Sequence, residues 1–124
     1  MIRVMNSVFP ADIVGLHVAK HGPDTRVVAV TGEVDALTAP QLADCLTAQL
    51  TAAKVVVVNL DGGQFLASAG LRALYEANER ATDQGRHLRL VSNSPNANVV
   101  LEGTGLREHF TFADTVPDAL NNVP

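Results

Sequence analysis

The segment at residues 55–60 constrains this chain most strongly. It begins with four successive valines, and the first polar residue is Asn59. A strand with one face in water alternates apolar and polar residues, whereas a strand covered on both faces does not. We therefore expect residues 55–60 to form a buried strand of a largely parallel sheet. Turn-forming residues follow at 61–63, and apolar residues at helical spacing predict a helix over residues 68–84.

The rest of the chain alternates between predicted strands and helices. Strands are predicted over residues 13–20, 25–31, 86–91 and 110–112, and helices over residues 38–52, from 94 to 103 or 105, and from 115 to 123. Turn residues at 21–24 predict that the first two strands form an antiparallel hairpin. This order is typical of an α/β fold, here a single-domain mixed, mainly parallel β-sheet with about four helices packed on it. We expect a tail at residues 1–12 and the domain at residues 13–124.

The start of the first predicted helix carries two sequence signals. Thr38 and Gln41 fit a capping box, in which each side chain bonds the backbone of the other residue. Leu37 and Leu42 occupy the positions of a hydrophobic staple. Cys45 falls on the apolar face of this helix, so we expect a small buried residue there and not a reactive thiol.

Composition argues against several classes of function. The 124 residues are 47% hydrophobic and 18% charged, which is enough for an aliphatic core. A net charge of −4 argues against binding to nucleic acid, which needs clustered Lys and Arg. No apolar run approaches the roughly 20 residues that cross a membrane. The start of the chain lacks a secretory pattern and the lone cysteine suits a reducing compartment, so we expect a cytoplasmic protein.

No metal, cofactor or catalytic site is predicted. His17 and His21 would have metal-ligand spacing on a helix, but on the predicted strand they would lie about 13 Å apart. The chain has no phosphate-binding loop, and the run around Ser68 lacks the first glycine of a G-x-S-x-G nucleophile elbow. We therefore expect a protein that is not an enzyme.

Ser68 opens the helix predicted over residues 68–84, where unpaired backbone N–H groups carry partial positive charge. Two interpretations of its hydroxyl are open. It could cap the helix, which contributes about 1 kcal/mol. It could instead carry a phosphate, for which a helix start is a ready anion site.

Three stretches together resemble the STAS domain of bacterial anti-sigma factor antagonists. They are GEVDALTAPQLADCL, KVVVVNLDGGQFLASAGLRAL and GRHLRLVSNSPNANVVLEGTGLREHFTFADTVPDAL, and the resemblance covers residues 13–120. Its motifs are G-E-x-D before the first predicted helix, the apolar strand, and x-S-x-G-L at the start of the next helix. The resemblance implies a STAS fold and a regulatory protein without catalytic activity or cofactor.

The resemblance also implies partners and a site. Such an antagonist binds an anti-sigma factor that is itself a serine kinase, and thereby releases a sigma factor for transcription. The kinase phosphorylates the serine that corresponds to Ser68, phosphorylation ends the binding, and a serine phosphatase reverses it. The implied partner surface surrounds this serine and comprises Glu33, Asp35, Leu66, Ala67, Gly70, Leu71 and Arg72.

Structural alternatives remain for part of this surface. Leu71 could be a core residue, and Gly70 could be small because the helix meets the sheet there. Arg72 could be the first member of an ion-pair row with Glu76 and Arg80, which follow at four-residue spacing.

Ala67 is the residue at which the chain departs from the family pattern, because the family usually has aspartate before the serine. Its loss could slow phosphorylation or change which kinase is accepted. One alternative is therefore a STAS-type scaffold that assembles regulatory proteins and is never phosphorylated. Another is an enzyme that uses Ser68 as a nucleophile, but no base is apparent near it in the sequence.

Overall fold

The computed structural model describes residues 14–121, without the side chains of residues 63–65 and 96. The predicted tail at residues 1–12 lies outside this range. In chain order, the elements are β1 (Val14–Lys20), β2 (Thr25–Val34), α1 (Ala39–Ala52), β3 (Val55–Leu66), α2 (Ser68–Asp83), β4 (His87–Val91), α3 (Pro95–Gly103), the 3₁₀ helix η3 (Leu106–His109), β5 (Thr111–Ala113) and α4 (Val116–Asn121).

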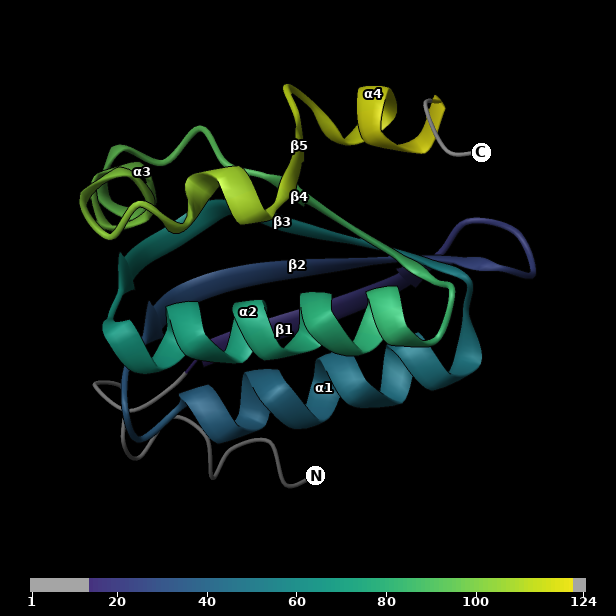
Figure 1. Ribbon diagram of the computed structural model, residues 1–124, viewed down its shortest axis with the longest axis horizontal. Helices are drawn as coiled ribbons and strands as arrows, with labels where there is room; N and C mark the ends of the chain where they lie inside the picture. The colour runs from purple at the N-terminus through teal and green to yellow at the C-terminus, as the bar shows by residue number, and fades with distance from the viewer. Residues whose placement is uncertain (1–13, 122–124) are drawn as a thin grey trace.

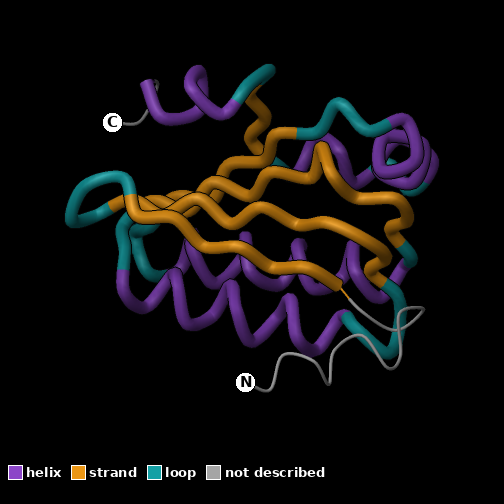
Figure 2. Tube along the Cα trace, turned by 180° about the vertical axis from the view of Figure 1, so that it is seen from behind, coloured by secondary structure: helices purple, strands orange, loops and turns teal. Residues whose placement is uncertain are grey.

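The five strands form one sheet in the order β1-β2-β3-β4-β5. β1 pairs with β2 in the antiparallel sense, and every later pair is parallel. Helices α1 and α2 run side by side along one face of this sheet (Figure 1). Seen from behind, the strands separate the α1–α2 layer from α4 (Figure 2). The predicted mixed, mainly parallel fold with its first hairpin is confirmed.

The strand β3 lies at the centre of the core and is buried on both faces, as the apolar run predicts. Val56, Val58 and Leu60 pack in the cluster that α1 and α2 cover. Val55 and Val57 pack in a second cluster, beneath α4. Alternate residues of a strand point to opposite faces, so a strand between two helical layers needs apolar residues at every position.

The end of β3 differs from the sequence-based expectation. We predicted a turn at residues 61–63, but the strand continues to Leu66 and only Ala67 separates it from α2. The prediction is wrong because β2 also continues, to Val34, and supplies a pairing partner as far as Leu66. Register shifts between Ala29 and Thr31 and after Gly32 accommodate the glycines within the pairing.

Candidate functional site

Ser68 is the first residue of α2, and its side chain is exposed. The capping position before it is held by Ala67, which is extended with φ −84° and ψ 172° and makes no side-chain cap. A serine caps a helix from the position before the first turn. The interpretation of Ser68 as the cap is therefore wrong by one residue, and the start of α2 has no side-chain cap.

Ser68 also differs from the other serines that the structure describes. Ser92 is buried and donates a hydrogen bond to Oδ1 of Asn98 at 2.8 Å. Ser94 is buried and accepts a bond from the backbone N–H of Ala97 at the start of α3. Among the described residues, Ser68 is therefore the exposed serine on which a modifying enzyme could act.

Thr38 holds the capping position of α1, as predicted, but its side chain makes no cap bond, and Asp35 closes the turn just before the helix. Oδ1 of Asp35 accepts the backbone N–H of Leu37 at 2.9 Å and that of Thr38 at 3.0 Å. The pKa of the Asp35 carboxyl is lowered, chiefly by the bond from the Thr38 backbone N–H and less by that from Leu37. Burial opposes this shift. The Thr38 hydroxyl donates to the backbone carbonyl of Glu33 at 2.9 Å, so it does not bond the first turn of α1.

The predicted hydrophobic staple at this helix start is also wrong. Leu42 is fully buried, but Leu37 is 68% exposed and cannot pack against it. The turn that Asp35 closes directs the Leu37 backbone N–H inward to the carboxylate. Leu37 is therefore an exposed apolar side chain and not the partner of Leu42 in a staple.

The ends of β2 and β3 bring the predicted acidic residues to the same end of the sheet as Ser68. The backbone N–H of Ala67 donates to the carbonyl of Val34 at 2.8 Å, and Val34 is the neighbour of both acidic residues. Glu33 is exposed, whereas the Asp35 carboxylate bonds the turn that precedes α1. Of the two, Glu33 is the exposed residue near the start of α2.

The remaining predicted surface residues divide by exposure. Leu66, Gly70 and Leu71 are buried, so they support the surface from beneath. Ala67 is half-buried, and Arg72 is exposed. Nε of Arg72 lies 3.1 Å from Oε2 of Glu76, which confirms the first pair of the predicted ion-pair row.

Gly70 is required where α2 approaches the sheet. A Cβ atom on this residue would lie 2.5 Å from Cγ1 of Val34 and 2.7 Å from Cδ1 of Leu66. Such distances do not occur without movement of the neighbours, so only glycine allows this approach. The close contact explains Gly70 structurally and fixes the position of the first turn of α2.

A hollow of about 250 Å³ opens beside Ser68, between α2 and the segment after α3. It is lined by Ser68, Leu71, Arg72, Tyr75, Thr104 and Leu106. The α2 residues could be found from the sequence, because they recur at the spacing of one helical face. Thr104 and Leu106 were missed, because no local pattern shows which distant segment will pack against a helix.

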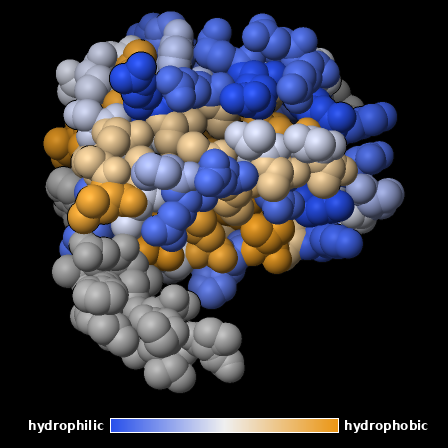
Figure 3. Space-filling model, turned by 90° about the horizontal axis from the view of Figure 1, so that it is seen from below, coloured by the Kyte–Doolittle hydropathy of each residue, from blue (hydrophilic) through white to orange (hydrophobic). Residues whose placement is uncertain are grey.

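A second hollow of about 230 Å³ lies on the other side of Arg72, in the furrow between α1 and α2. Small side chains form its floor, among them Ala39, Ala43, Ala69 and Ala73. Figure 3 shows this face of the molecule, where apolar side chains form a band with hydrophilic ones around it. Arg72 thus stands between two apolar depressions close to Ser68.

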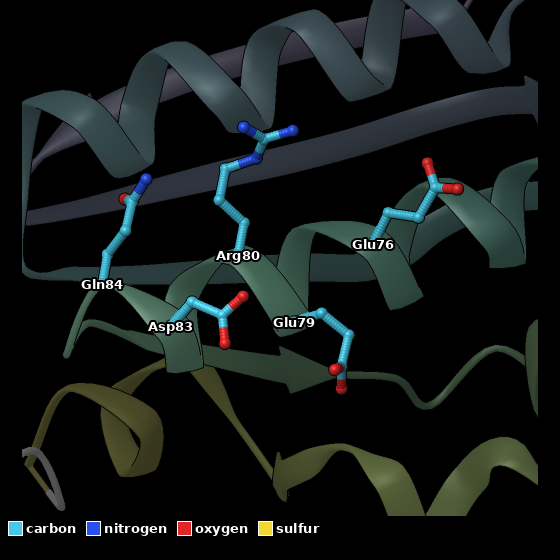
Figure 4. A pocket seen from close by; sticks show the side chains of 5 residues that line it. All are labelled: Glu76, Glu79, Arg80, Asp83 and Gln84. Carbon is cyan, nitrogen blue, oxygen red and sulfur yellow. The ribbon is translucent and has the colours of Figure 1, made fainter.

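The largest of these hollows, about 400 Å³, lies at the other end of α2 and has a different character. Its lining comes from α2 and the residue that follows it: Glu76, Glu79, Arg80, Asp83 and Gln84 (Figure 4). Arg80 extends toward α1, while Glu79 extends away from it. It is a space between long charged side chains on one helix, and no second element contributes to it.

Other chemical groups do not assemble into a site in the part of the chain that the structure describes. Over those residues, no group of three or more His, Cys, Asp or Glu side chains could hold a metal ion. Cys45 is half-buried against the core, and burial raises the pKa of its thiol. No helix within the described range is both long and apolar enough to cross a membrane.

Comparison with known proteins identifies the fold. The family model of the STAS domain matches residues 17–119. The chain is 30% identical to an anti-sigma factor antagonist from Mycobacterium paratuberculosis, whose crystal structure matches with a TM-score of 0.81 over 90% of this chain and 95% of that one. No curated protein sequence matches the chain.

Two further structures show the same fold at lower identity. The anti-sigma factor antagonist SpoIIAA in its unphosphorylated form has a TM-score of 0.73 and 18% identity, over 86% of this chain and 94% of that one. The phosphorylated form of SpoIIAA from Bacillus has a TM-score of 0.69 and 19% identity, over 89% and 100%. With the family model matched over most of its length, this chain belongs to the STAS domain family.

Proposed function

We propose that this protein is an anti-sigma factor antagonist that binds an anti-sigma factor serine kinase and is released when that kinase phosphorylates Ser68. The observation that carries the proposal is the exposed hydroxyl of Ser68 on the first turn of α2, in a chain that belongs to the STAS family. The similarity to an antagonist at 30% identity supports the same function.

A phosphate on Ser68 would be compatible with the fold. It adds about −1.5 to −2 charge at neutral pH. The first N–H groups of α2 have no side-chain cap, so they remain available to an anion together with the positive end of the helix dipole. The phosphorylated form of SpoIIAA shares this fold, which supports that compatibility.

The same phosphate would weaken binding to a partner. The surface near Ser68 has apolar depressions on both sides of Arg72, and a partner that covers them must remove water from whatever lies between. A phosphate within that contact has a large desolvation cost. Each 1.4 kcal/mol of that cost weakens binding about tenfold, so one group is enough for a switch.

The partner surface in this proposal is narrower than the sequence analysis implied. Ser68, Ala67, Arg72 and Glu33 are available for contact, while Leu66, Gly70 and Leu71 hold them in place from below. Leu37 joins the surface, because it is exposed at the adjacent helix start.

The proposal is tested by incubating the chain with anti-sigma factor serine kinases of its source organism and ATP. The expected result is a gain of one phosphate in the intact mass, loss of this gain in Ser68→Ala, and dissociation of the kinase complex as the phosphate accumulates. A phosphatase should reverse the mass change. Stable complex formation without any transfer would refute the switch.

That last outcome would support the second candidate, a scaffold that assembles regulatory proteins and is never phosphorylated. The observation in its favour is Ala67, which stands where the family usually has aspartate. We favour the antagonist because Ser68 is exposed and the start of α2 has no side-chain cap. A scaffold role requires neither feature. Both roles belong in the cytoplasm, and both act by binding and not by catalysis.

A further inference from the structure

We propose that the hollow beside Ser68 is an anchor pocket for an apolar side chain of the partner protein, and that a phosphate on Ser68 closes it by drawing Arg72 away from Glu76. The inference rests on the proposed function, and it names the partner chemistry and the regulation of the same surface.

The walls of the hollow favour an apolar occupant. Leu71, Tyr75 and Leu106 belong to its lining, and the surface that the hollow exposes is almost entirely apolar. The Thr104 hydroxyl also lines it, but this group donates to the backbone carbonyl of Val100 at 2.9 Å and is already satisfied. A polar occupant would therefore lose its bonds to water and find few in return.

The size of the hollow favours a single side chain. Its volume is about 250 Å³. Pockets that hold whole small molecules begin at roughly 300 Å³ and enclose most of the ligand. A smaller open depression suits one anchoring side chain at a protein interface, where such anchors contribute much of the binding energy.

Ser68 and Arg72 lie on the helix face that borders this hollow. Ser68, Leu71, Arg72 and Tyr75 follow one another at the i, i+3, i+4 and i+7 spacing of one face of α2. A phosphate on the first of these residues would therefore lie at the rim of the hollow, one helical turn from the guanidinium of Arg72.

Arg72 has two alternative anionic partners, one on each side. It now pairs with Glu76, four residues later, and both side chains are largely exposed. A phosphate on Ser68 would stand four residues earlier. An acidic group that precedes a basic one by four residues is the more favourable order on a helix. The phosphate also has the larger charge and can accept two guanidinium bonds, so it should displace Glu76.

The re-paired guanidinium would cover the hollow. Arg72 lines the depressions on both sides of its helical ridge, and in the new pair it would lie beside Leu71 and Tyr75. An apolar side chain of the partner could then enter only by displacing a hydrated ion pair. Phosphorylation would thereby close the anchor pocket and introduce negative charge at the same place.

The experiment uses the full chain with phosphoserine incorporated at position 68 during translation, so it requires no kinase and can fail while the proposed function holds. Phosphorus NMR then gives the second pKa of the phosphate, which is about 6 without a partner. Arg72→Gln should raise this pKa by about 0.3 unit or more, and Glu76→Gln should lower it. Arg80→Gln is the matched control, because Arg80 does not line the hollow. Equal pKa values in the Arg72→Gln and Arg80→Gln chains would overturn the re-pairing.

The anchor pocket is tested with isopentanol and toluene as probes for leucine and phenylalanine side chains. In the unphosphorylated chain, either probe should shift the methyl NMR signals of Leu71 and Leu106 and leave those of the fully buried Leu50 unchanged. Phosphoserine at position 68 should weaken probe binding about twofold or more, and Arg72→Gln should restore it. No shift with either probe would overturn the anchor, and equal binding to both forms would overturn its closure.

Discussion

The starts of helices α1 and α2 lie at the same end of the sheet, but the residues that lead into them differ. Thr38 at the capping position of α1 makes no side-chain cap, but in the turn just before it the Asp35 carboxylate accepts the backbone N–H groups of Leu37 and Thr38, which places a negative charge near the positive end of the helix. At α2, Ala67 holds the capping position without a side-chain bond. The exposed hydroxyl of Ser68 belongs to α2, whose preceding residue carries no carboxylate.

The difference indicates which helix start can receive an anion. The first N–H groups of a helix need partners, and a carboxylate that supplies them leaves little for a second anion. A phosphate at the start of α1 would be repelled by the Asp35 carboxylate. A phosphate at the start of α2 would instead supply an acceptor for the first backbone N–H groups. Four predictions test this contrast, from the largest expected effect to the smallest.

Gly70→Ala should have the largest effect, because the start of α2 is held against the sheet at this residue. The new Cβ would collide with Val34 and Leu66, and such overpacking costs about 1–3 kcal/mol of unfolding free energy. Urea denaturation measures the loss. Gly103→Ala is the control, since no neighbour lies within 4 Å of its Cβ position, and it should change stability by less than about 0.5 kcal/mol. Equal costs for the two variants would contradict the close contact.

Ser68→Asp should weaken binding to the anti-sigma factor about tenfold or more, because it places a charge within the contact. Titration calorimetry with the anti-sigma factor measures this change, and circular dichroism should show an unchanged fold. Ala48→Asp adds the same charge on an exposed position of α1 and should leave the affinity unaltered. If both variants weaken binding equally, net charge and not position is responsible.

Ala67→Asp should give α2 a side-chain cap and a carboxylate next to its first turn, and raise the unfolding free energy by about 0.5–1 kcal/mol. The extended backbone of Ala67 suits a capping residue, so no rearrangement is needed. Ala67→Asn separates the two causes, because it keeps the cap without the charge. Loss of stability in both variants would show that the start of α2 does not accept a cap.

Asp35→Asn should have the smallest effect, and the effect should depend on pH. The lowered pKa of Asp35 means that its ionised form stabilises the folded chain above the unfolded pKa of about 3.9, and that this contribution disappears as pH falls through the folded value. The melting temperature of the variant should therefore lie below that of the wild type near pH 7, with the gap closing in acid. A gap that stays constant across this range would exclude the carboxylate charge as its cause.

The sequence predicted the architecture well, because its signals are local. The apolar run in β3 and the turn at residues 21–24 each determine structure within a few neighbours, and both expectations are confirmed. The family resemblance added the topology that such signals cannot define. The position of Ser68 at the start of α2 was predicted from the helical spacing of the apolar residues that come after it.

The errors concern places where local chemistry offered two solutions or distant segments decided the outcome. The Thr38 hydroxyl could bond forward to the helix or back to Glu33, and in the structure it bonds back while Asp35 closes the turn before α1. Gly62 and Gly63 suggested a turn, but they lie within β3, because β2 is long enough to pair with them. Leu106 was invisible as a site residue, because its neighbour Tyr75 is remote in the sequence.

The single residue between β3 and α2 has a consequence for how such a protein would respond to a kinase. Only Ala67 separates Ser68 from the deeply buried strand β3, so the backbone around Ser68 has little freedom to move when the hydroxyl is phosphorylated. Phosphorylated and unmodified chains should then superpose closely and differ only in what they can bind. Substitutions in the hydrophobic interior would accordingly change the amount of folded protein in a cell. They would not change the loss of partner affinity that phosphorylation causes in each folded molecule.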